Sequence, residues 1–285
     1  MIQPATLSFL RERYDIVYCD VWGVIRDGHR LLPPAIEALR AFRRSGGFVC
    51  LVSNSPSRAP AMAAMLQRMG MPADAVDAMV TSGDAIHAEL AVRTPGKAFR
   101  VGPPDMDDDL YAGLEIEFTD LASADFIACT GPDDYWKGKP EDYRGMLETA
   151  LERGLDLVCA NPDIIVQAGD RLVYCAGAIA RLYTQMGGRS IVAGKPHRPI
   201  YELARAAAEA AGRTVDLSRV LAIGDGPETD IAGACRTGID SLYITEGIHG
   251  ADIEGDSPVP ETVADMLARY DVEATWMATA LVWQA

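Results

Sequence analysis

Tyr18–Val24, with the sequence YCDVWGV, is the stretch that best indicates the fold, because an apolar run ends there at the acidic residue Asp20. The residues before it predict a buried strand over 15–20, so Asp20 is expected where that strand meets solvent. Along the rest of the chain, strand-like runs alternate with helix-like runs. This alternation predicts an α/β fold with a parallel sheet and helices on both faces. It is seen in strand-like runs at 47–53, 220–224 and 241–245 and in helix-like runs at 34–45, 59–69, 199–211 and 230–237.

The middle of the chain repeats the same alternation on its own. Strand-like runs fall at 98–101, 125–130 and 155–160, and helix-like runs at 141–153 and 177–186. We therefore predict a second α/β domain over 85–190, inserted into a core domain formed by 1–84 and 191–285.

The amino-acid composition limits the kinds of binding partner that we expect for this protein. The chain of 285 residues carries a formal net charge of -15, which disfavours binding to a nucleic-acid backbone. No apolar run approaches the ~20 residues of a membrane span, and the N-terminus lacks the pattern of a signal peptide. The six cysteines include no C-x-x-C pair, which favours reduced thiols. We expect a cytoplasmic protein with neither nucleic acid nor membrane as partner.

Polar residues follow the apolar runs. Asp20 can act as a nucleophile toward phosphorus, and Ser53 with Asn54 can hold phosphate oxygens. Lys195, after the apolar pair Ile191-Val192, can neutralise a carboxylate and a phosphate together. Because the carboxyl ends of parallel strands meet at one edge, we expect these groups to converge there.

The loop at 224–230 adds two acids. Asp225 and Asp230 are five residues apart and suit a hard cation such as Mg²⁺, which prefers oxygen ligands. Each feature also has a plain structural interpretation: 53–55 can be an ordinary turn, and Asp230 can cap a helix that begins at Ile231.

Taken together and in this order, the motifs resemble the haloacid dehalogenase (HAD) superfamily. Its pattern is a strand ending in D-x-D-G, a Ser or Thr at a strand end, a Lys, and an acidic G-D-x(4)-D loop. The details are similar to the class IIA (NagD-like) phosphatases over about residues 15 to 250. The matching pieces are Asp27-Gly28, Pro34-Ala35, 51–56 (LVSNSP), 160–163 (ANPD) and 194–196 (GKP).

The resemblance implies a Rossmann-like core with a C2-type cap and a Mg²⁺-dependent phosphatase. Its substrate would be a small phosphorylated metabolite, of the sugar phosphate or nucleotide monophosphate class, and a homo-oligomer is compatible with it. The resemblance implies that Asp20 is the nucleophile, that Ser53 and Asn54 bind the phosphate, and that Lys195 neutralises Asp20 and the phosphate. It also implies that Asp20, the Trp22 carbonyl and Asp225 are the metal ligands. Asp230 would support the metal and its waters.

Trp22 departs from that pattern. The superfamily's phosphatases usually carry a second Asp there, which protonates the leaving group and later activates water. An indole does neither, and losing such help typically costs ~10²- to 10⁴-fold in rate. Two alternatives therefore stay open: a phosphometabolite-binding or regulatory protein with little turnover, and a metal-independent 2-haloacid dehalogenase.

Overall fold

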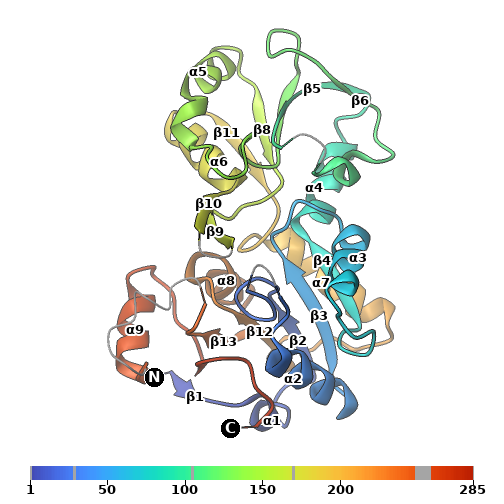
Figure 1. The fold of residues 1–285 in the computed structure, drawn as a ribbon, viewed down its shortest axis with the longest axis vertical. Helices are drawn as coiled ribbons and strands as arrows, with labels where there is room; N and C mark the ends of the chain where they lie inside the picture. The colour runs from blue at the N-terminus through green and yellow to red at the C-terminus, as the bar shows by residue number, and fades with distance from the viewer. Residues whose placement is uncertain (1, 28–29, 104–105, 169–170, 248–257, 285) are drawn as a thin grey trace. The chain divides into compact units, whose positions relative to one another are not determined.

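The computed structural model describes residues 2–27, 30–103, 106–168, 171–247 and 258–284, and Gly28, named above, lies outside them. The chain packs as two compact units (Figure 1). The first contains residues 1–53, 63–80 and 195–285, and the second contains 54–62 and 81–194. The domain boundaries expected from the sequence, at 84/85 and 190/191, stay a prediction.

The first unit is built on a sheet that, in the described ranges, has seven strands in the order β1-β14-β13-β12-β2-β3-β4. The strand β2 runs parallel to β12 on one side and to β3 on the other, as the alternating sequence predicts. The bounds are β1 (Gln3–Pro4), β2 (Ile16–Cys19), β3 (Phe48–Ser53), β4 (Ala78–Thr81), β12 (Val220–Gly224), β13 (Asp240–Ile244) and β14 (Trp276–Ala278).

The register of the central strands aligns their carboxyl ends. Cys19 lies opposite Leu51 of β3 and opposite Ile223 of β12. The chain therefore leaves these three neighbouring strands within two residues of the same level of the sheet. That edge is where ligands bind in folds of this kind.

Helices pack against this sheet through the apolar residues that lie along one side of each helix. In α7 (Arg198–Ala210) the buried residues Ile200, Tyr201 and Ala204 share one core cluster with residues of β2, β3 and β12. Prolines occupy the first turns of α2 and α7, where the missing N–H costs no helical hydrogen bond. The other helices are α1 (Leu7–Leu10), α2 (Pro33–Arg44), α3 (Ala59–Arg68), α8 (Ala232–Thr237) and α9 (Pro260–Ala268).

The second unit has its own sheet of five strands in the part of the chain described, in the order β11-β8-β7-β5-β6. The hairpin of β9 (Ile165–Ala168) and β10 (Arg171–Tyr174) is antiparallel and separate from it. Its other elements are α4 (Ser82–Ala91), β5 (Gly96–Val101), β6 (Ile116–Phe118), β7 (Phe126–Cys129), α5 (Arg144–Glu152), β8 (Asp156–Cys159), α6 (Ala176–Gln185) and β11 (Arg189–Val192). None of the helices described in either unit is both long and apolar enough to cross a membrane.

Two expectations about local structure were wrong. Lys195 follows β11, and this strand pairs with β8 of the second sheet, where Ile191 lies opposite Val158. The lysine therefore does not come from a strand end of the first sheet. The helix expected over 230–237 begins earlier, because a single wide helical turn at Pro227–Ile231 precedes α8.

The second unit also offers a pH-dependent test of its packing. Burial raises the pKa of Asp107 to about 6, and this side chain makes no capping hydrogen bond to the short helix that follows it. A carboxyl with a raised folded-state pKa destabilises the fold as pH rises from about 4 to about 6. Asp107→Asn should thus stabilise the protein by about 1–3 kcal/mol at pH 7.5 and by almost nothing at pH 4. Urea unfolding at the two pH values measures this, and an equal effect at both would contradict it.

Candidate active site

Three carboxylates meet at the carboxyl edge of the first unit's sheet. Asp20 directly follows β2, Asp225 directly follows β12, and Asp230 lies in the helical turn after it. One oxygen from each can be chosen so that all lie within 4.8 Å of one another. Their exposed fractions are 7%, 5% and 4%, so the cluster is buried.

Lys195 bridges two of these acids. Its Nζ donates to Asp20 Oδ1 at 2.5 Å and to Asp230 Oδ1 at 2.7 Å, and the residue is 3% exposed. The four side chains carry a formal charge of -2 when all are ionised, from three carboxylates and one ammonium. Unit charges ~4 Å apart interact by about 4 kcal/mol at an effective dielectric near 20, so such a cluster favours a further cation.

A glycine makes the close approach of the loops possible. Gly23 has φ +78°, and a Cβ built on it would lie 2.0 Å from Asp225 Oδ2. Only glycine fits that contact, and only glycine adopts that conformation at little cost. The sequence Asp20-Val-Trp-Gly23 therefore folds so that the loop after β2 lies against the acid after β12.

Burial changes the acidity of the proposed nucleophile. Desolvation raises the pKa of Asp20 well above its usual range, the negative charges of Asp230 and Asp225 raise it further, and Lys195 opposes both. A carboxylate must be ionised to attack phosphorus. Additional positive charge beside Asp20 would oppose this rise in its pKa and favour the ionised form.

The donor set fits a hard divalent cation. Carboxylate oxygens are the ligands that Mg²⁺ prefers, and Asp20 and Asp225 are the two acids that the strand ends present. Asp230 is tied to Lys195 and also accepts a hydrogen bond from the Gly226 N–H at 3.1 Å. It is not the isolated helix cap that its sequence also allowed, because it lies inside the helical turn.

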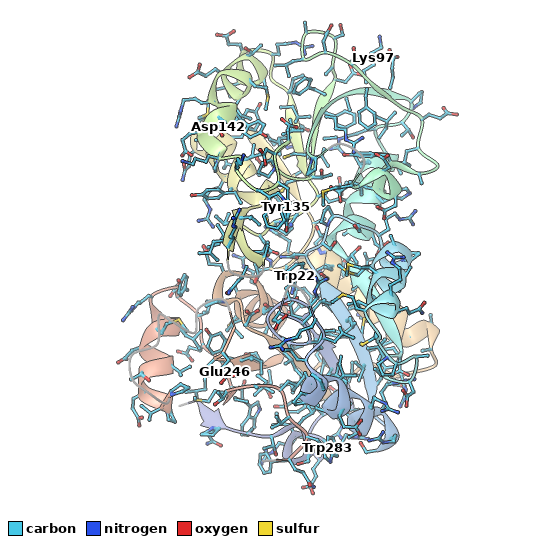
Figure 2. The ribbon with its side chains drawn as sticks, viewed as in Figure 1. Trp22, Lys97, Tyr135, Asp142, Glu246 and Trp283 are labelled. Atoms are coloured by element: carbon cyan, nitrogen blue, oxygen red, sulfur yellow. The ribbon has the colours of Figure 1, made fainter. Side chains whose placement is uncertain are left out.

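Trp22 is held by a residue that the sequence did not mark as functional. The guanidinium carbon of Arg26 lies 4.0 Å from the centre of the Trp22 ring, and Arg26 is 5% exposed. A cation stacked on indole at this distance is a favourable contact, worth more when it is desolvated. Figure 2 labels Trp22 in the loop beyond the sheet. Residues 22–26 form a turn rather than a helix, so their spacing in the sequence did not indicate this contact.

The two predicted phosphate ligands, Ser53 and Asn54, are consecutive in the chain but belong to different compact units. Ser53 is the last residue of β3 and is 1% exposed. Asn54, the next residue, packs with the second unit, and its Nδ2 donates to Asp163 Oδ1 at 2.7 Å. The structure therefore brings Asp20, Lys195, Asp225 and Asp230 into direct contact or close proximity, and it ties Asn54 to another group. Phosphate binding by Ser53 and Asn54 stays a prediction.

The parallel sheet with helices packed on it is a Rossmann-like α/β fold, and the buried carboxylate–lysine cluster lies at the carboxyl edge where such folds carry their active sites. A model of the haloacid dehalogenase-like hydrolases matches residues 17–113, and a second model, of HAD-hydrolase-like proteins, matches 192–270. A solved haloacid dehalogenase-like hydrolase from Brucella suis 1330 is similar over 98% of this chain and 100% of its own, with 42% identity and a TM-score of 0.87.

Two characterised enzymes are also similar to this chain. D-glycerol 3-phosphate phosphatase of Mycobacterium tuberculosis is 26% identical over 86% of this chain and 67% of its own length. Ribonucleotide monophosphatase NagD of Escherichia coli K12 is 25% identical over 90% of this chain and 98% of its own. The chain belongs to the haloacid dehalogenase-like hydrolases, within their class IIA (NagD-like) phosphatases.

Proposed function

We propose that this protein is a Mg²⁺-dependent phosphatase that works through an aspartyl-phosphate on Asp20. The observation that supports it best is the buried cluster in which Lys195 bridges Asp20 and Asp230, with Asp225 close by. A nucleophilic carboxylate beside a lysine and a cation site is suited to an electrophile that brings negative charge of its own. A phosphate monoester is such an electrophile, because its negative charge lies on oxygens bonded to the reacting phosphorus.

In the proposed first step, a carboxylate oxygen of Asp20 forms a bond to phosphorus. The ester P–O bond breaks, and the leaving oxygen takes the electron pair. Lys195 holds the attacking carboxylate through its hydrogen bond to Oδ1 and opposes the charge that builds on the phosphoryl oxygens. Mg²⁺, held by Asp20, the Trp22 carbonyl and Asp225, would supply further neutralisation of that charge.

In the second step, water attacks phosphorus and the bond between phosphorus and Asp20 breaks. Phosphate leaves, and the Asp20 carboxylate is restored. Trp22 offers no base for this water, so we expect hydrolysis of the aspartyl-phosphate to limit turnover. Ser53 is proposed to orient the phosphoryl oxygens through its hydroxyl.

The substrate class follows from the relatives' names. One acts on D-glycerol 3-phosphate and another on ribonucleotide monophosphates, so we infer a small phosphorylated metabolite of the sugar phosphate or nucleotide monophosphate class. We further infer a cytoplasmic location, which the free thiols of all six cysteines support. The oligomeric state stays a prediction.

Metal removal tests the proposal directly. Phosphate release from p-nitrophenyl phosphate should fall at least ~10²-fold in EDTA and return on addition of Mg²⁺, because the acidic cluster cannot otherwise accept a phosphate dianion. Circular dichroism in EDTA provides the control that the fold persists. Equal turnover with and without Mg²⁺ would contradict the metal requirement.

A phosphometabolite-binding protein with little turnover is the second candidate, and Trp22 is the observation that favours it. The two candidates differ in their response to excess substrate. The phosphatase releases many equivalents of phosphate per protein chain, whereas the binding protein releases one at most.

A further inference from the structure

The loop Asn161–Asp163 lies against Asn54 and Gly194, which are chain neighbours of two proposed site residues. Asp163 Oδ1 accepts a hydrogen bond from Asn54 Nδ2 at 2.7 Å. Asn54 is 3% exposed and Asp163 is partly buried, so the Asn54 side of this hydrogen bond is shielded from water. Loss of a hydrogen bond to a buried amide costs free energy, which favours keeping the pair together.

The loop itself is built to hold Asp163 in place. The Asp163 backbone N–H donates to Asn161 Oδ1 at 3.0 Å, and the Cys159 thiol donates to the Asn161 carbonyl oxygen at 3.3 Å. Directly after the loop, the Ile164 carbonyl accepts from the Cys175 N–H at 3.0 Å. The loop is thus fixed both to the end of β8 and to the residue before α6.

The same pair contacts a second part of the chain. A Cβ built on Gly194 would lie 2.6 Å from Asn54 Oδ1 and 2.7 Å from Pro162 Cγ. Atoms at that separation overlap, so the backbone of Gly194 runs directly against the Asn54 amide and the loop. The amide of Asn54 therefore donates to Asp163 and lies close to the Gly194 backbone.

Both residues that the loop contacts are chain neighbours of proposed site residues. Asn54 comes directly after Ser53, and Gly194 comes directly before Lys195. A displacement of either residue carries the proposed phosphate ligand or the bridging lysine with it. A misplacement of about 1 Å at a reacting group can cost ~10²-fold in rate.

We propose that Asp163 is a positioning residue of this enzyme, acting through the Asn54 amide on Ser53 and Lys195. The inference rests on the proposed phosphatase function. It assigns Asp163 no contact with substrate: its part is to fix the backbone on which two substrate-binding side chains stand.

The test compares three variants under Mg²⁺ with p-nitrophenyl phosphate. Asp163→Ala should lower kcat/KM by about 10- to 100-fold and weaken competitive inhibition by inorganic phosphate to a similar extent. Asp163→Asn keeps an acceptor oxygen for the Asn54 amide and should stay within about threefold of wild type. Asp120→Ala removes an exposed carboxylate that accepts from the Ser123 N–H in the same unit, and it should change neither quantity.

A double-mutant cycle separates positioning from a general loss of structure. If Asp163 acts through Asn54, Asp163→Ala should have less than about a twofold further effect in the Asn54→Ala background. Asp163→Ser replaces the alanine variant if thermal melting shows that the latter does not fold. Wild-type phosphate inhibition in Asp163→Ala, or full additivity in the cycle, would overturn the inference. A wild-type protein that releases no phosphate at all would instead refute the proposed function.

Discussion

Asp20→Asn is expected to lower Mg²⁺-dependent phosphate release by roughly 10⁴-fold or more, the scale of loss seen when a covalent nucleophile is removed. The amide has nearly the shape of the carboxylate but cannot form an acyl phosphate. The protein should nevertheless fold, because Lys195 keeps its contact with Asp230. Burial raises the pKa of Asp20, which means that its charge opposes folding, so the melting temperature should stay equal or rise.

Phosphate release and thermal melting of the same preparation check this prediction. Asp216→Asn is the control, because Asp216 is an exposed acid that accepts from the Ser218 N–H and should leave turnover unchanged. Wild-type turnover in Asp20→Asn, with the fold intact, would show that another group attacks phosphorus.

Trp22→Asp should raise turnover on alkyl phosphates by about 10²-fold or more if general acid and base help is what the wild type lacks. Arg26 lies against the ring that is removed, so the variant also loses this cation–ring contact. Trp22→Asn is the matched control, since it loses the same ring and gains no titrating group. It should not share the gain.

The dependence on the leaving group sharpens this prediction. Without an acid, the ester oxygen leaves unprotonated, so wild-type single-turnover rates should fall steeply from nitrophenyl to phenyl to alkyl phosphates. In Trp22→Asp that dependence should flatten, because a proton is supplied as the bond breaks. Rates in single turnover isolate this step from hydrolysis of the aspartyl-phosphate. An equally steep dependence in both proteins would mean that Trp22 does not set the rate of leaving-group departure.

The sequence predicts most of the first unit because its strands are short, buried and bounded by clear turns. The range 220–224 is observed as predicted, and Asp20 and Asp225 follow strands that lie side by side. Lys195 shows where this reasoning fails. Its strand reads as part of the same sheet, yet β11 pairs with β8, and pairing partners far apart in the chain are not encoded in local periodicity.

The contacts that sequence reasoning missed are of the same long-range kind. The link between Asn54 and Asp163 spans 109 residues, and nothing in either local sequence predicts the partner. The half-exposed hairpin of β9 and β10 was likewise missed, because Leu172 and Tyr174 break the alternation expected of a strand with one buried face.

Rapid acid quenching of the enzyme with substrate and Mg²⁺, followed by peptide mass spectrometry, tests the central claim most directly. The account predicts one phosphoryl group on the peptide that contains Asp20, sensitive to hydroxylamine as an acyl phosphate is, and absent from Asp20→Asn. Sustained turnover in which Asp20 is never phosphorylated, or a phosphoryl group on another side chain, would contradict it.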